Sequence, residues 1–248
     1  MKMQALAFLT SAALAAAVGG LSPAQSKPVQ VQAPAHVDAP RAGDPFPFAT
    51  CPISGDKLGT KGPAIVKVYD GREIRFCCDA CVAKFEKNPP KRLARLDDEI
   101  IKDQMPLYPL IGSVVSGKKL GEAGKPFDFV WCNRLVRLAD ATEKAEFLAS
   151  PDKYFDILNQ AAIEAQTKGY PFTTCVVHQD KALVTGGSRD VVIAGRLIRL
   201  CSDACVAEVM RNPATYIEQI DAARQAAPAA APSTPPVSAP SHSGTNAP

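Results

Sequence analysis

The chain has 248 residues and a formal net charge of +3, from 28 lysine and arginine residues and 25 aspartate and glutamate residues. The two signs are interleaved, and there is neither a basic stripe nor a nucleic-acid-binding motif, which argues against a nucleic-acid partner. A phosphate-binding loop, a serine–histidine–acid set and paired carboxylates are also missing from the sequence, so no enzyme activity is predicted.

The first 24 residues have the pattern of a secretory signal peptide. Lys2 precedes the apolar run Ala5–Val18, and the small residues Ser22-Pro23-Ala24 suit a cleavage site. The run is too short to span a membrane and no second apolar stretch follows, so we expect no transmembrane segment after signal cleavage. No cysteine follows the cleavage site, which argues against a lipoprotein. The pattern predicts export in the bacterial style, to the periplasm or as a secreted protein.

Two segments have the composition of disordered chain. Residues 25–45 are rich in proline and alanine, and residues 227–248 consist almost wholly of small residues and proline. Such segments bury too little apolar surface to fold, so we predict a disordered linker and a disordered tail. The folded part is therefore expected between residues 46 and 226.

Residues of matching type recur every 62 residues in this part of the sequence. For example, 62 positions separate Cys51 from Ser113, and 62 separate Ser113 from Cys175. A fixed period of this kind indicates tandem units, which we place at 46–107 (first unit), 108–169 (middle unit) and 170–226 (third unit). The matching residues of the three units are Cys51, Ser113 and Cys175; Gly71, Asn133 and Gly195; Cys77, Ala139 and Cys201; Cys81, Glu143 and Cys205; and Pro89, Pro151 and Pro213.

The sequence pattern of each unit predicts the same α+β order of elements. A loop forming a knuckle comes first, followed by a β-hairpin, a short helix and a second helix after the proline. The expected hairpins are Ile65–Tyr69 with Arg72–Phe76, Phe127–Trp131 with Arg134–Leu138, and Val191–Ile193 with Arg196–Leu200. The expected second helices are Pro90–Gln104, Asp152–Lys168 and Ala214–Ala226. Asp79, Asp140 and Asp203 begin the short helices, where a carboxylate suits the N-cap.

The two outer units each carry three cysteines at one spacing. The candidate metal ligands are Cys51, Cys77 and Cys81 in the first unit, and Cys175, Cys201 and Cys205 in the third. The last two of each trio share a face at a helix start, and the first arrives from the knuckle, so three sulfurs can converge on one ion. Three thiolates suit Cu(I) and Zn(II), and also toxic ions such as Hg(II) and Cd(II).

A fourth ligand is available in each outer unit, and both candidates have an alternative. His178 is either an imidazole ligand or a surface turn residue. Cys78 is either a fourth thiolate or a buried small hydrophobe, and the latter is favoured because adjacent side chains tend to point apart. Cys132 matches no ligand position and is interpreted as a free thiol.

Disulfides are the main alternative, because eight cysteines in an exported protein are often paired. The three cysteines at the shared spacing in each outer unit cannot all pair with one another, which favours metal binding. A thiol–disulfide redox protein using Cys77, Cys78 and Cys81 is a second alternative, although no Cys-x-x-Cys lies in a βαβ context and no clear general base is nearby. A disulfide-stabilised envelope interaction module is a third.

Several first-unit motifs resemble the TRASH and YHS domain families, which are small metal-binding modules. These motifs are Cys51-Pro52-Ile53-Ser54-Gly55, Asp70-Gly71, Phe76-Cys77-Cys78-Asp79-Ala80-Cys81 and Phe85-Glu86-Lys87-Asn88-Pro89. The resemblance covers about residues 46–226, with a longer gap after the first cysteine than the TRASH pattern has. It implies three tandem treble-clef-like units and a role in sensing, trafficking or resisting heavy metals, copper especially.

The sequence thus predicts an exported soft-metal-binding protein that scavenges, carries or senses copper or zinc at two three-cysteine sites. An envelope metal-efflux or metal-delivery protein is the partner class that this implies. The middle unit has Ser113, Ala139 and Glu143 in place of the ligands and more aromatic residues than its neighbours. We therefore expect it to be a structural spacer.

Overall fold

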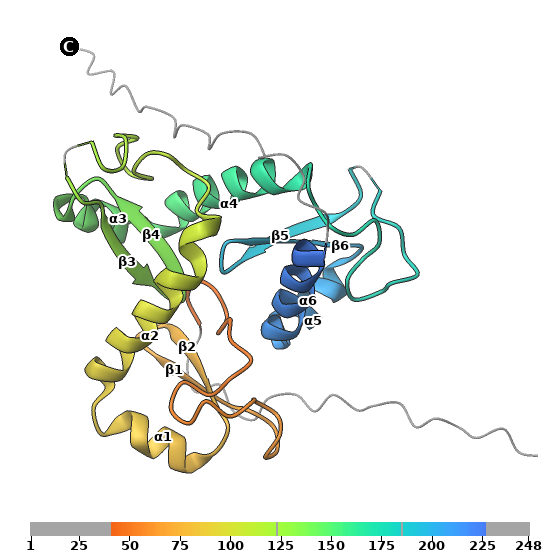
Figure 1. The fold of residues 1–248 in the computed structure, drawn as a ribbon, viewed down its shortest axis with the longest axis horizontal. Helices are drawn as coiled ribbons and strands as arrows, with labels where there is room; N and C mark the ends of the chain where they lie inside the picture. Colours follow the sequence, from red (N-terminus) through yellow and green to blue (C-terminus); the bar gives the residue numbers. More distant parts are fainter. Residues whose placement is uncertain (1–40, 123, 185, 227–248) are drawn as a thin grey trace, which may run out of the picture. The chain divides into compact units, whose positions relative to one another are not determined.

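The computed structural model describes residues 41–122, 124–184 and 186–226 (Figure 1). The predicted signal peptide, residues 25–40 of the predicted linker and the predicted tail at 227–248 lie outside the described residues. The described part is α+β, with three two-stranded sheets and six α-helices. None of its helices has the length and apolar character that crossing a membrane requires.

A hairpin followed by helices occurs three times along the described chain (Figure 1). The strands are β1 (Ile65–Tyr69), β2 (Arg72–Phe76), β3 (Phe127–Trp131), β4 (Arg134–Leu138), β5 (Arg189–Ile193) and β6 (Arg196–Leu200). The helices are α1 (Asp79–Glu86), α2 (Pro89–Gln104), α3 (Lys144–Ala149), α4 (Pro151–Thr167), α5 (Asp203–Arg211) and α6 (Pro213–Ala226). The short 3-10 helices η1 (Met105–Leu107) and η2 (Ala141–Glu143) follow α2 and precede α3. The predicted hairpins are confirmed, with β5 starting two residues earlier than expected.

All three hairpins are antiparallel and turn through two residues with positive φ. In the first turn, φ is 50° at Asp70 and 79° at Gly71. Two successive positive values match a type I′ turn, whose twist suits the flanking strands. The other two turns place Cys132 and Ala194 at the first central position, with φ of 44° and 50°.

The predicted N-caps are correct in one helix of three. Asp140 caps η2, accepting a hydrogen bond from the Thr142 amide at 2.8 Å. Asp79 and Asp203 are instead the first helical residues of α1 and α5, so that Cys78 occupies one of the N-cap positions. The Asp203 carboxylate pairs with Arg189 at 2.8 Å. The extended backbone that follows β2 and β6 runs one residue further than expected.

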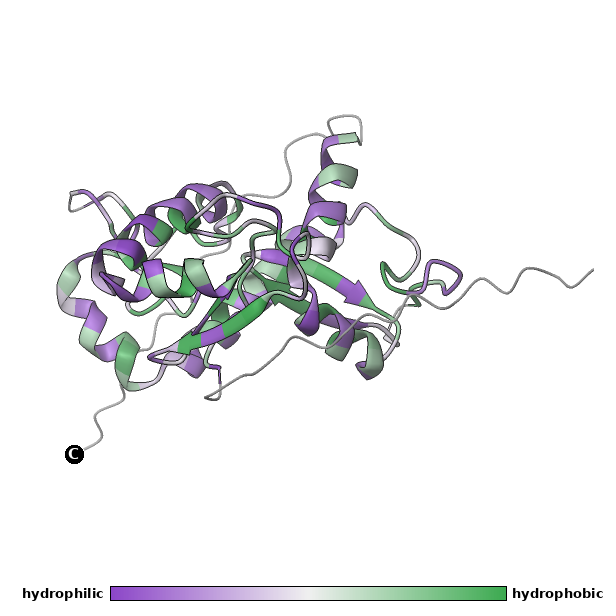
Figure 2. Cartoon of the chain, turned by 90° about the horizontal axis from the view of Figure 1, so that it is seen from below, coloured by the Kyte–Doolittle hydropathy of each residue, from purple (hydrophilic) through white to green (hydrophobic). Residues whose placement is uncertain are grey.

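Each unit has its own hydrophobic core between its hairpin and its helices. In the outer units the candidate cysteines belong to this core, whereas the middle core is aromatic. Phe147 is fully buried there, with its ring centroid 5.4 Å from that of Phe129 and 5.6 Å from that of Tyr154. Figure 2 shows mainly hydrophobic strands and helices that alternate between hydrophilic and hydrophobic residues, as expected for helices with one face on a core.

Glutamine side chains connect each unit to the next. Gln104 in α2 donates to the Asn133 carbonyl at 2.8 Å and accepts from the Leu135 amide at 2.9 Å. Gln166 in α4 donates to the Gly195 carbonyl at 2.8 Å. Each of these helices therefore holds the hairpin turn of the following unit.

Residues 41–45 were expected to belong to a disordered linker, and this part of the prediction is wrong. Asp44 accepts hydrogen bonds from Arg134 at 2.7 Å and from the Ala194 amide at 2.6 Å. The Ala42 amide donates to the Gly71 carbonyl at 2.7 Å. Residues 41–45 thus contact all three hairpins, a long-range pairing that composition does not reveal.

Candidate metal centres

Cys51, Cys77 and Cys81, which we call the first cluster, come from three parts of the first unit. Cys51 lies in the loop before β1, Cys77 directly follows β2, and Cys81 is on the first turn of α1. All three are buried, and their Sγ atoms lie within 4.8 Å of one another. Thiolates bound to one ion at about 2.3 Å lie about 4 Å apart, so the cluster fits a shared ion.

The loop around Cys51 directs backbone amides at its sulfur. The Gly55 amide donates to the Cys51 carbonyl at 2.9 Å, and Gly55 has a φ of +75°, a conformation that favours glycine. Burial raises the pKa of Cys51, but hydrogen bonds from the amides of Cys77, Ser54 and Ile53 outweigh it and lower the pKa to about 7. The loop therefore favours a thiolate at Cys51 before any ion arrives.

The neighbouring thiols behave differently. Burial raises the pKa of Cys81 to about 12, and its hydrogen bond with Cys77 acts in the same direction. Their Sγ atoms lie 3.7 Å apart. An ion that binds here must displace the proton of Cys81, so binding is expected to weaken as the pH falls.

Cys78 is placed differently from the interpretation that the sequence favoured. Its side chain is partly exposed, and its Sγ lies 3.8 Å from that of Cys77 and 3.7 Å from that of Cys81. The two adjacent side chains therefore do not point apart, because Cys78 occupies the extended N-cap position of α1. Cys78 is nevertheless not part of the set whose sulfurs all lie within 4.8 Å of one another.

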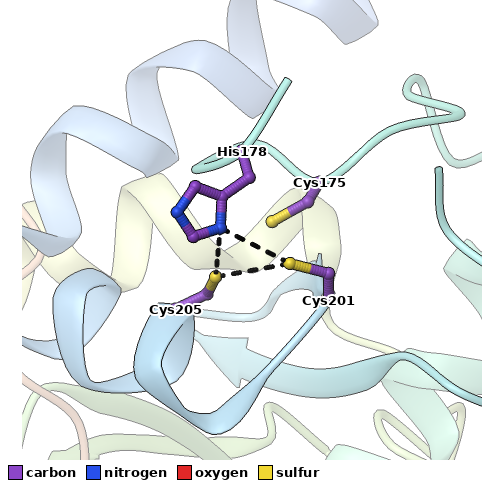
Figure 3. Close-up of side chains that lie close together, drawn as sticks. All are labelled: Cys175, His178, Cys201 and Cys205. Carbon is purple, nitrogen blue, oxygen red and sulfur yellow. Dashed lines mark hydrogen bonds between the residues drawn. The ribbon is translucent and has the colours of Figure 1, made fainter. Parts of the chain in front are cut away.

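Cys175, His178, Cys201 and Cys205, which we call the second cluster, repeat this arrangement with a fourth donor (Figure 3). One atom from each side chain lies within 4.8 Å of the other three. His178 Nδ1 is 3.2 Å from Cys205 Sγ and 3.5 Å from Cys201 Sγ, and these two sulfurs are 3.6 Å apart. Three sulfurs and one imidazole nitrogen are a donor set typical of a structural zinc site.

The second cluster also repeats the electrostatics of the first. Burial raises the pKa of Cys175, but amides of His178, Cys201 and Val177 donate hydrogen bonds that lower it overall. Burial raises the pKa of Cys201, with hydrogen bonding to Cys205 next in effect. Each cluster therefore combines a thiol of lowered pKa from the loop with a thiol of raised pKa near the helix.

The middle unit fills the matching position with hydrogen bonds instead of sulfurs. Ser113 is fully buried and donates a short hydrogen bond to Glu143 Oε2, which also accepts from the Ala139 amide at 3.1 Å. The Ser113 hydroxyl accepts from the Val115 amide at 3.2 Å. Here a carboxylate joins the loop, the strand end and the helix start.

All eight cysteines are free, and the closest sulfur separations given above, 3.6 to 3.8 Å, are far from the bonded distance of about 2.05 Å. Cys132 lies apart from both clusters in the turn between β3 and β4, where it is buried. Its backbone contacts residues 41–45, because the Asp44 amide donates a hydrogen bond to the Cys132 carbonyl at 3.0 Å.

The sequence pattern did not predict two of these features. It identified the lost ligands Ser113 and Glu143 but not their pairing with each other, although their matching positions and their donor and acceptor groups could have revealed it. It also missed Ser54, whose Oγ lies 3.3 Å from Cys77 Sγ. A hydroxyl three residues after the cysteine is too common a turn feature to stand out.

Comparison with known proteins gave no match to a family model, a curated protein or a solved structure.

Proposed function

We propose that this chain is an exported protein that binds soft metal ions, copper or zinc, at the two clusters. The observation that carries the proposal is the convergence of three cysteine sulfurs within 4.8 Å in both outer units, from matching positions in the sequence. Free sulfurs that gather in this way are suited to coordinate a thiophilic ion. The resemblance to TRASH and YHS domains, and with it three tandem treble-clef-like units, is part of this proposal.

The proposed role is scavenging, carrying or sensing the ion in the cell envelope, with a metal-efflux or metal-delivery protein as partner. Its support is the signal-peptide pattern of the first 24 residues together with the clusters. A carrier needs no catalytic constellation, which agrees with the sequence.

Elemental analysis of the full chain, purified without added chelator, tests the proposal. We expect copper or zinc in the wild-type protein, less metal in C77S/C81S and in C201S/C205S, and none when both pairs are replaced. C132S is the matched control, because it removes a buried thiol outside the clusters, and it should keep the wild-type metal content. A metal-free protein that also fails to bind added Cu(I) or Zn(II) after reduction would contradict the proposal.

A further inference from the structure

The two clusters differ at one matching residue. Ser54 and His178 each lie three positions after the loop cysteine of their unit, and the middle unit has Ser116 there. Ser54 Oγ is 3.3 Å from Cys77 Sγ, and His178 Nδ1 is 3.5 Å from the matching sulfur, that of Cys201. Equivalent loops, one residue longer in the third unit, therefore hold a different group beside each trio of cysteines.

The two groups have different ligand chemistry. A neutral imidazole is a good ligand for Zn(II), whereas a serine hydroxyl is a poor ligand for soft or borderline ions. The second cluster thus supplies four donors, which suits tetrahedral Zn(II). The first supplies three sulfurs from Cys51, Cys77 and Cys81, which suits an ion that accepts low coordination, such as Cu(I).

We propose that the residue at position 54 or 178 sets the metal preference of its cluster, with zinc favoured in the second cluster and Cu(I) in the first. This inference rests on the proposed function and assigns an ion to each cluster. A single chain then holds two ions of different chemistry, in units separated in the sequence by a middle unit without cysteine ligands.

Asp56 and Cys78 are the competing fourth donors in the first cluster. Asp56 Oδ2 lies 3.9 Å from Cys77 Sγ, but this carboxylate is paired with Lys61 at 2.6 Å, so Cys78 is the stronger competitor. Its sulfur lies close to two members, Cys77 and Cys81, but outside the mutual 4.8 Å set. It is also partly exposed, whereas the three members of the first cluster are buried. The test must therefore separate a site completed by Cys78 from one limited by Ser54.

The experiment uses the full chain with one cluster disabled at a time. C201S/C205S keeps the first cluster, and C77S/C81S keeps the second. Ser54→His is added to the former and His178→Ser to the latter, each at an exposed position. Ser116→His is the matched control in both, because it adds a histidine at the exposed equivalent position beside no cysteines.

Zn(II) and Cu(I) affinities are measured by competition with chromophoric chelators under anaerobic, reducing conditions, and Co(II) reports coordination through its visible spectrum. We expect S54H to raise Zn(II) affinity by at least about tenfold and to give Co(II) bands of tetrahedral intensity. H178S should lower Zn(II) affinity by at least about tenfold and change Cu(I) affinity much less. S116H should change neither affinity.

Three results would overturn the inference while leaving metal binding intact. They are equal metal preferences in the two clusters, unchanged Zn(II) affinity in H178S, and a first cluster that already holds tetrahedral Co(II) and loses it in C78S. Failure of both clusters to bind any of these ions would overturn the proposed function as well.

Discussion

At the scale of single residues, each cluster combines a loop thiol whose pKa is lowered with a thiol near the helix whose pKa is raised. Cys51 and Cys175 receive amide hydrogen bonds from their loops, whereas burial raises the pKa of Cys81 and Cys201. The loop cysteine is thus the one prepared to take an ion first.

This difference predicts how the metal-free protein titrates. The pKa of Cys51 is about 7, below the ordinary thiol value, so the folded state favours its thiolate. The stability that this thiolate contributes is present above the ordinary thiol pKa and is lost as the pH falls through about 7. Thiolate absorbance near 240 nm should rise around pH 7 in the wild-type protein, and C51S should reduce that rise.

C132S is the control, since burial raises the pKa of Cys132 to about 11 and its loss should leave the step near pH 7 unchanged. An equal step in C51S and the wild-type protein would show that the loop amides do not lower the thiol pKa.

Glu143 provides a second prediction at this scale. Its Oε2 accepts from the Ser113 hydroxyl and the Ala139 amide inside the middle unit, so E143A leaves one buried and one half-buried donor without an acceptor. An unsatisfied buried donor costs about 1–3 kcal/mol. We expect E143A to lower the free energy of unfolding by about 2 kcal/mol or more in urea titrations. Trp131, the chain's one tryptophan, reports the transition because its ring lies 5.2 Å from that of Phe155.

The conservative variant E143Q keeps an acceptor oxygen and should lose less stability than E143A. Its amide group would place a donor at Oε1, which has no hydrogen-bond partner among the described residues, so it should still be weaker than the wild-type protein. An E143A protein as stable as the wild type would show that the Glu143 carboxylate does not stabilise the middle unit.

At the scale of secondary-structure elements, the three hairpin turns are held together by residues 41–45. The Asp44 carboxylate is the main link, since it accepts from Arg134 of β4 and from the Ala194 amide in the β5–β6 turn. Both partners of the ion pair are largely buried, with 5% and 12% of the Arg134 and Asp44 side chains exposed.

We therefore expect D44A to lower the free energy of unfolding by about 3 kcal/mol, because breaking a buried pair leaves its charge without a partner. E99A is the control: it removes a carboxylate from an exposed pair with Arg95, and exposed pairs contribute about 0–1 kcal/mol. Denaturant titration of both variants measures the difference. Equal losses in D44A and E99A would mean that residues 41–45 do not hold the turns.

Some of these elements could be predicted from the sequence and others could not. The strand pairs could be predicted because two-residue turns and strand patterns are local signals, and these signals recur every 62 residues. The 62-residue period also located the cysteines that converge. It did not identify the role of Asp44 or the N-cap position of Cys78, because the first depends on contacts between distant units and the second on a one-residue shift of a helix start.

At the scale of the whole described chain, two cysteine clusters flank a middle unit that is held by hydrogen bonds and aromatic packing. Such an arrangement predicts that metal removal affects the outer units and spares the middle one. Small units of this size often depend on a metal for stability, whereas the middle unit has Glu143 and the aromatic core around Phe147.

We expect chelator and reductant to decrease amide-exchange protection in the first and third units while the emission of Trp131 stays unchanged. Hydrogen exchange with peptide-level readout measures the former and fluorescence the latter. Loss of protection in all three units together, with a red shift of Trp131 emission, would show that the middle unit also depends on metal.

X-ray absorption at the metal edge of the loaded protein shows directly which atoms bind the ions at the two clusters. We expect a first shell dominated by sulfur, at about 2.3 Å for zinc, with a nitrogen contribution that disappears in H178S. A shell of oxygen and nitrogen alone, with the cysteines found in disulfides, would contradict this expectation.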